Sequence, residues 1–215
     1  TIKGHMKEVQ ILKSVYHRNV IKYKAHFEGE TLGQTPIRAL YIVLEYADGG
    51  SLHDLIHKNP NELIDTMKLC FLLHHVALGM AYLHQLGSKQ GSRKRIIHRD
   101  LKPANILICN GVAKIADFGI SKILEGGARS ANITNTCGTT AYMAPEQRKR
   151  NWRNIMSHKV DVWSFGVIIG YCLSGISPFN PHARYTKNVE IYSQDDLNGS
   201  TYKSTITNKK LHQNL

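Results

Sequence analysis

Cysteine is scarce in this sequence, and no two cysteines lie close together. The 215 residues contain four, each 28 or more positions from the next: Cys70, Cys109, Cys137 and Cys172. Zinc sites bring cysteines together at short spacing, and small secreted domains carry them densely. We therefore expect free thiols in a reducing compartment, which predicts an intracellular, cytoplasmic protein.

Long apolar runs are also missing. The longest uninterrupted run of apolar residues and glycine, Phe165–Leu173, has nine residues, whereas a helix needs roughly 20 to span a bilayer. The N-terminus lacks the charged and then apolar pattern of a signal peptide. We expect no membrane span.

Acidic residues are the third shortage. There are 16 of them against 28 Lys and Arg, which gives a formal charge of +12, and Thr66–Arg99 contains none. Nucleic acid, a membrane surface or an acidic protein are the partners that such a charge attracts. The two basic clusters, Arg93–Arg95 and Arg148–Arg150, carry no interleaved aromatic residues for base stacking. We therefore expect a protein-docking surface rather than a nucleic-acid site, which a steep salt dependence of nucleic-acid binding would contradict.

What is present is a globular composition, 42% apolar and 20% charged, with clear apolar periodicity. Apolar residues at every third position predict a helix over Met6–Val15, and alternating or β-branched residues predict strands over Asn19–Phe27 and Ala39–Tyr46. The longest amphipathic pattern predicts a helix over Thr66–Leu86. Val160–Leu173 is apolar nearly all round, which predicts a helix buried at the centre of a domain. Short strands complete the set, at Ile96–Ile97, Ile106–Ile108 and Ala113–Ala116.

Three short motifs follow one another in the second half of the chain. They are His98–Asn105 (HRDLKPAN), Asp117–Gly119 (DFG) and Ala144–Glu146 (APE). Their order and separation resemble the catalytic loop, the metal-binding triplet and the end of the activation segment in eukaryotic protein kinases. The resemblance extends over about Met6–Phe179, and it implies a two-lobed fold.

Transfer of a γ-phosphoryl group from ATP needs a carboxylate that orients the acceptor hydroxyl, a cation beside the phosphate, and Mg²⁺. The resemblance makes Asp100, Lys102 and Asn105 the catalytic residues. Asp100 would accept the hydroxyl proton and Lys102 would place an ammonium at the γ-phosphate. Asn105 and Asp117 offer the hard oxygen ligands that suit Mg²⁺.

The same segment points to the kind of acceptor. Lys102, two residues after Asp100, and Thr139 resemble the serine/threonine type rather than the tyrosine type. Glu45–Leu52 and Ala77–His84 resemble the tyrosine-kinase-like group of serine/threonine kinases, which includes the MAP kinase kinase kinases. The implied substrate is a protein serine or threonine, within intracellular signalling.

The upstream half resembles the part of a kinase that binds the nucleotide. Glu8 matches the helix glutamate that pairs with an ATP-positioning lysine, and Leu44 matches the gatekeeper, although ordinary core packing explains Leu44 equally well. The remaining residues assigned by resemblance to nucleotide binding are Glu45 and Ala47 by their backbones at the adenine edge, Asp48 and Ser51 on the ribose side, Leu107, and Asp117.

Two further residues, His98 and Asp161, are assigned to structure instead. The resemblance makes His98 part of a buried internal spine, beside Phe118, Leu12 and Tyr23. Asp161 would anchor the backbone of the catalytic loop, although an aspartate at this place is also a normal helix cap. In the activation segment, phosphate on Ser130, Thr134 or Thr136 is expected to order the loop by pairing with Arg99.

The sequence departs from the family at its start. No Gly-rich phosphate loop and no strand lysine precede Glu8, and Lys3 and Lys7 are poor substitutes. Two explanations remain open. The chain is part of an active serine/threonine kinase, in which case the 215 residues alone are inactive or weak, or it is a catalytically inactive kinase-like scaffold. The intact Asp100, Lys102, Asn105 and Asp117 favour the first.

The predicted fold class is therefore α+β, a kinase-like fold with an incomplete small lobe and a helical large lobe. We expect residues 1–48 to form the partial small lobe, 49–180 the large lobe, and 181–215 a polar tail. The oligomeric state is left open.

Overall fold

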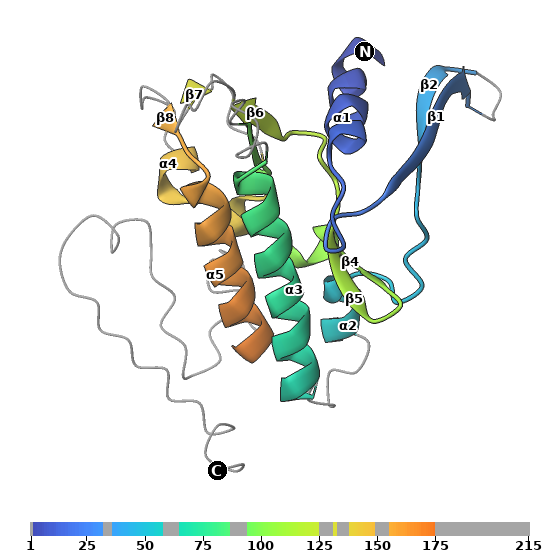
Figure 1. Cartoon of the computed structure of the whole chain (residues 1–215). Coiled ribbons are helices and arrows are strands. Elements are labelled where there is room, and N and C mark those ends of the chain that lie inside the picture. Colours follow the sequence, from blue (N-terminus) through green and yellow to red (C-terminus); the bar gives the residue numbers. More distant parts are fainter. Residues whose placement is uncertain are drawn as a thin grey trace, which may run out of the picture.

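The computed structural model describes residues 2–31, 36–57, 65–86, 94–124, 131–132, 138–148 and 155–174. Its first part consists of helix α1 (Ile2–Ser14) and an antiparallel ribbon of β1 (Tyr23–Glu30) and β2 (Arg38–Leu44). Figure 1 shows this ribbon extending away from the rest of the molecule. Its side chains include exposed apolar ones, because a two-stranded ribbon has little to pack against.

The predicted first strand was misplaced. The structure begins β1 at Tyr23, and Asn19–Ile21 lie instead against the large lobe. The Ile21 N–H donates to the Ile115 carbonyl at 2.9 Å, and the Ile115 N–H donates to the Asn19 carbonyl at 3.0 Å. Val20 is 2% exposed in this position. The apolar residues before Tyr23 thus belong to the core between the lobes, which the loose alternation did not reveal.

Helices α3 (Thr66–His84) and α5 (Lys159–Ser174) run side by side in the second part (Figure 1). Helix α3 begins at an Asp65 cap, whose carboxylate accepts from the Met67 N–H at 2.9 Å. A Cβ on Gly79 would lie 2.5 Å from the Asn19 carbonyl oxygen, so this close approach of helix and chain requires glycine.

Helix α3 is also long and apolar enough to span a membrane by length and composition alone. Its buried residues, among them Leu72, Val76 and Leu83, belong to the main core cluster together with Ile106 and Ile115. A core helix passes the same test, so this observation leaves the expectation of no membrane span unchanged.

The expectation that α5 is buried all round was wrong. Val160 and Ile168 are fully buried, but Val162 is 53% and Leu173 62% exposed. Within the described part of the chain, α5 packs on η2 (Thr140–Tyr142) and α3. A uniformly apolar sequence therefore does not by itself establish burial on every face.

Short elements between α3 and α5 carry the three motifs. β3 (Arg95–Ile97) pairs with β6 (Lys122–Leu124), and β4 (Ile106–Cys109) pairs with β5 (Val112–Ile115). Asn110 and Gly111 both have positive φ, the conformation of a tight two-residue hairpin turn. The other elements are α2 (Leu52–His57), η1 (Pro103–Asn105), β7 (Ala131–Asn132), α4 (Pro145–Arg148) and β8 (Ile155–Met156).

Candidate active site

The backbone of the catalytic loop is held by one carboxylate. Asp161, 1% exposed in the first turn of α5, accepts from the His98 N–H at 2.9 Å and from the Arg99 N–H at 2.8 Å. Its Oδ2 also lies 2.8 Å from Nε2 of His84, on α3. The predicted anchoring by Asp161 is confirmed, and the same side chain joins the loop to both long helices.

His98 is buried within the loop. Its Nδ1 accepts from the Asp100 N–H at 3.3 Å, and its Nε2 donates to the Ala116 carbonyl at 2.9 Å. Its ring centroid lies 5.3 Å from that of Phe118. Leu12 belongs to the same core cluster as Phe118, and Tyr23 packs against that cluster. These contacts agree with the structural role predicted for His98.

Lys102 and Thr139 both contact the Asp100 carboxylate. Lys102 Nζ lies 2.7 Å from Oδ2, and the Thr139 N–H donates to Oδ1 at 2.7 Å. Lys102 also donates to the Thr139 hydroxyl at 2.9 Å, which closes a triangle between the loop and the end of the activation segment. Burial alone raises the pKa of Asp100, but the hydrogen bonds from Lys102 and Thr139 outweigh it and hold the pKa below its usual value. Asp100 is therefore ionised at neutral pH.

The two proposed metal ligands differ in their surroundings. Asn105 is 7% exposed, and its amide nitrogen donates to the Asp100 carbonyl at 2.9 Å and to Asp100 Oδ2 at 3.3 Å. Because the nitrogen is committed to Asp100, the amide oxygen is the group presented to a cation. Asp117 has an exposed side chain and a φ of 65°. Its Oδ1 accepts from the Gly119 N–H at 3.3 Å. An amide oxygen and an exposed carboxylate fit Mg²⁺, which keeps water and phosphate in its other positions.

Glu8 lies beside the Asp117–Gly119 triplet. A Cβ on Gly119 would stand 3.6 Å from Oε2 of Glu8 and 3.3 Å from Oδ1 of Asp117. Helix α1 thus brings Glu8 next to this triplet, and its pairing with an ATP-positioning lysine stays a prediction.

The segment between the two lobes, residues 44–51, is held in place by contacts of its side chains and backbone. Leu44 packs against the main core. Asp48 accepts from the Asn110 N–H at 2.6 Å, and Ser51 makes reciprocal bonds with Asp54, by its N–H at 2.9 Å and its hydroxyl at 2.7 Å. Both side chains predicted at the ribose therefore have structural partners, while Ala47 accepts from the Gly50 N–H at 3.4 Å.

Leu107 lies on β4, directly below this segment. It forms an isolated bridge with Ser51 and is half-buried against the main core. The structure thus brings Leu107 next to Ser51, in the segment that follows the small lobe. It also brings Asp100, Lys102 and Asn105 together at one place. The adenine and ribose contacts themselves stay predictions.

Comparison with known proteins agrees with this geometry. The model of the protein kinase domain family matches residues 2–213. This chain belongs to the protein kinase family. It is 36% identical over 187 residues to the human serine/threonine-protein kinase ULK1, covering 80% of this chain and 15% of that protein.

Other relatives are kinases too. The kinase domain is 33% identical to a probable myosin light chain kinase of Dictyostelium discoideum, over 93% of this chain and 48% of that protein. It is 41% identical to mitogen-activated protein kinase kinase 1 of Arabidopsis thaliana, over 65% of this chain and 36% of that protein. The domain is of the serine/threonine type, and it spans less than half the length of these relatives.

Two residues of the kinase domain were missed by sequence reasoning. Lys114 pairs with Glu45 across the lobes. Gln147, 4% exposed, donates to the Arg99 carbonyl at 3.2 Å and accepts from the Ala144 N–H at 3.0 Å. For Lys114, the sequence does offer a signal, because a lysine stands between the apolar residues of a strand. Nothing in the sequence distinguishes Gln147.

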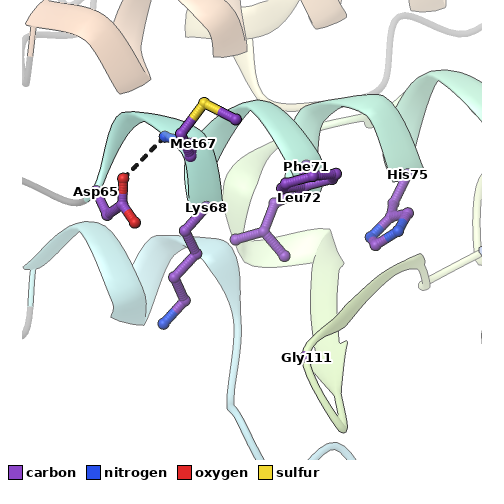
Figure 2. Close-up of a pocket in the computed structure, with 7 residues that line it drawn as sticks. All are labelled: Asp65, Met67, Lys68, Phe71, Leu72, His75 and Gly111. Carbon is purple, nitrogen blue, oxygen red and sulfur yellow. Dashed lines mark hydrogen bonds between the residues drawn. The ribbon is translucent and has the colours of Figure 1, made fainter.

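A groove of about 470 Å³ lies apart from this kinase site. Figure 2 shows Lys68, Leu72 and His75 leaving α3 on the side where the hairpin turn with Gly111 lies, and Asp65, Met67 and Phe71 complete the lining of the groove. It contains none of the predicted site residues.

Among the described residues, no group of three or more His, Cys, Asp or Glu suited to a metal occurs. Ser130, Thr134 and Thr136 lie outside the described residues.

Proposed function

We propose that this kinase domain transfers the γ-phosphate of ATP to serine or threonine hydroxyls of a protein substrate. The observation that carries the proposal is the triangle of Asp100, Lys102 and Thr139: the Asp100 carboxylate accepts from the Lys102 ammonium and the Thr139 N–H, and the ammonium also donates to the Thr139 hydroxyl. Fixed charges at the place of reaction are what phosphoryl transfer requires from the protein.

Asp100 orients the substrate hydroxyl and accepts its proton as the oxygen attacks. Its lowered pKa keeps the carboxylate ionised, so a proton acceptor is present at neutral pH. Lys102 is held by Asp100 and Thr139, so its ammonium is in place to neutralise charge on the transferring phosphoryl group. Thr139 thereby positions Lys102 and not the nucleotide.

The proposed ligands of Mg²⁺ are Asn105 and Asp117, and the cation when bound neutralises phosphate charge beside Lys102. Asn105 also holds the Asp100 backbone through its amide nitrogen. For ATP we propose the backbones of Glu45 and Ala47 at the adenine edge, with Leu44 and Leu107 as its apolar contacts. Asp48 and Ser51 stay proposed ribose neighbours.

Location and subgroup are proposals as well. The described cysteines, Cys70, Cys109 and Cys172, are free thiols, which supports a reducing, cytoplasmic location. Membership of the tyrosine-kinase-like group stays a prediction.

The test is a phosphotransfer assay on the protein in the full length that its gene encodes. With labelled ATP and Mg²⁺, the wild type is expected to label serine and threonine peptides and to leave a matched tyrosine peptide unlabelled. Asp100→Asn should lower kcat by about 10²- to 10⁴-fold, because the proton acceptor is lost.

Asp65→Asn is the matched control. This residue caps α3 away from the proposed site, so phosphotransfer should stay within twofold of wild type. A wild-type protein that binds no ATP and labels no peptide would establish the second explanation, an inactive scaffold. An Asp100→Asn variant as active as wild type would remove Asp100 from the mechanism.

A further inference from the structure

One carboxylate joins the segment between the lobes to both of them. Oε1 of Glu45 accepts from the Lys22 backbone N–H at 2.7 Å and from Lys114 Nζ at 2.8 Å. The Glu45 N–H in turn donates to the Lys22 carbonyl at 2.9 Å. The peptide around Glu45 is thus fixed on one side by the chain that enters β1 and on the other by β5.

Lys114 also pairs with Leu107, a proposed apolar contact of the adenine ring. In the β4–β5 ladder it lies directly across from Leu107, and Leu107 forms a bridge with Ser51. Lys114 therefore links two residues that are distant in sequence. Its side chain contacts the carboxylate of Glu45, whose backbone is proposed at the adenine edge, and its backbone pairs with Leu107, a proposed apolar contact of ATP.

The surroundings strengthen this contact. The Lys114 and Glu45 side chains are only 13% and 20% exposed, so water screens the pair weakly. The Cys109 thiol close by is buried, which raises its pKa; Glu45 raises that pKa further and Lys114 lowers it. Loss of the ammonium alone would leave the Glu45 carboxylate with a single backbone donor in a partly dry site.

We propose that Lys114 is a positioning residue for the nucleotide. Acting through Glu45, it fixes the position of the backbone between the lobes relative to Leu107, and this position determines the affinity for ATP. This inference rests on the proposed phosphotransfer function. A merely structural ion pair would contribute to stability and leave nucleotide affinity unchanged, so the two roles predict different measurements.

The experiment compares Lys114→Met, Lys114→Arg and wild type in full-length protein, with KM for ATP, kcat, and calorimetric binding of ADP. Lys114→Met should raise KM and the ADP dissociation constant about three- to tenfold, as expected for a residue that acts through a neighbour. We expect kcat to change less than twofold. Lys114→Arg, which keeps the charge, should return KM to within about twofold of wild type.

Two further variants complete the design. Lys24→Met removes an exposed lysine from β1 and should leave both constants unchanged. Glu45→Gln should raise KM as Lys114→Met does, and the double variant should be no worse than either single one, because both act through one contact.

The failures are distinguishable. A wild type without ADP binding or phosphotransfer overturns the proposed function and this inference with it. A wild type that binds ADP, with Lys114→Met lowering only the unfolding temperature, overturns the inference alone. So do effects of Glu45→Gln and Lys114→Met that add in the double variant.

Discussion

Asp161 and Phe27 represent two regions that are built differently. Asp161 is 1% exposed and accepts bonds from two backbone N–H groups and one histidine of the large lobe. Phe27, on the β1–β2 ribbon, is 55% exposed and stacks on Tyr41 at 5.0 Å between ring centroids. The difference teaches that the loop carrying Asp100 is held by buried polar contacts, whereas the ribbon around Phe27 is held by an exposed aromatic pair.

Replacing the anchor should have the largest effect. Asp161→Ala removes the carboxylate that accepts from the buried His98 and Arg99 N–H groups, at a cost of about 3–5 kcal/mol in the free energy of unfolding. Urea unfolding measures it. Asp65→Ala, which removes an exposed cap, is the control and should cost about 1 kcal/mol. Equal losses in the two variants would show that the buried contacts of Asp161 contribute no more to stability than an exposed helix cap.

The buried amide of Gln147 should come next. Gln147→Leu keeps the volume but removes the hydrogen bonds that the Gln147 amide makes with the Arg99 carbonyl and the Ala144 N–H, which costs about 1–3 kcal/mol. Gln10→Leu, on an exposed position of α1, is the matched control and should be nearly neutral. Thermal unfolding of both proteins decides, and a Gln147→Leu variant as stable as Gln10→Leu contradicts the assignment.

Acid should weaken the catalytic loop selectively. The pKa of Asp100 is below its unfolded value, so its contribution to stability is complete above the unfolded pKa and is lost as pH falls through the folded pKa. Unfolding free energies measured from pH 7 downward should therefore fall more steeply for wild type than for Asp100→Asn. Parallel curves would show that the bonds from Lys102 and Thr139 do not favour the ionised form.

The smallest effect is expected on the ribbon. Phe27→Ala loses the stacked contact with Tyr41, worth about 0.5–1.5 kcal/mol, and should leave KM for ATP within twofold of wild type. Differential scanning calorimetry and steady-state kinetics test the two parts separately. A large loss of phosphotransfer would mean that the ribbon positions the site after all.

The long helices were predictable because their apolar patterns extend over many turns. Helix α3 was expected over Thr66–Leu86 and spans Thr66–His84. The strand expected over Asn19–Phe27 was misplaced because short apolar segments do not reveal which lobe they pack against. The burial of α5 was overestimated for the same reason, since its composition does not show which face meets a neighbour.

The motifs predicted which residues share the site, since their spacing is specific. Asp100, Lys102 and Asn105 do lie together, and Asp161 holds the loop. The contacts of Lys114 and Gln147 depend on which backbone groups the fold brings within reach. Such pairings are properties of the assembled chain, and no local pattern encodes them.

The distance along the chain between the loop and its anchor has a consequence for synthesis. Asp161 lies 62 residues after Arg99. At about 5–20 residues per second, a ribosome needs roughly 3–12 s to extend the chain from Arg99 to Asp161, 62 positions later. During that interval the nascent loop carries Asp100 without the Asp161 carboxylate that holds its backbone. The loop His98–Asn105 therefore cannot reach its final conformation in a growing polypeptide until the translation of α5 has begun.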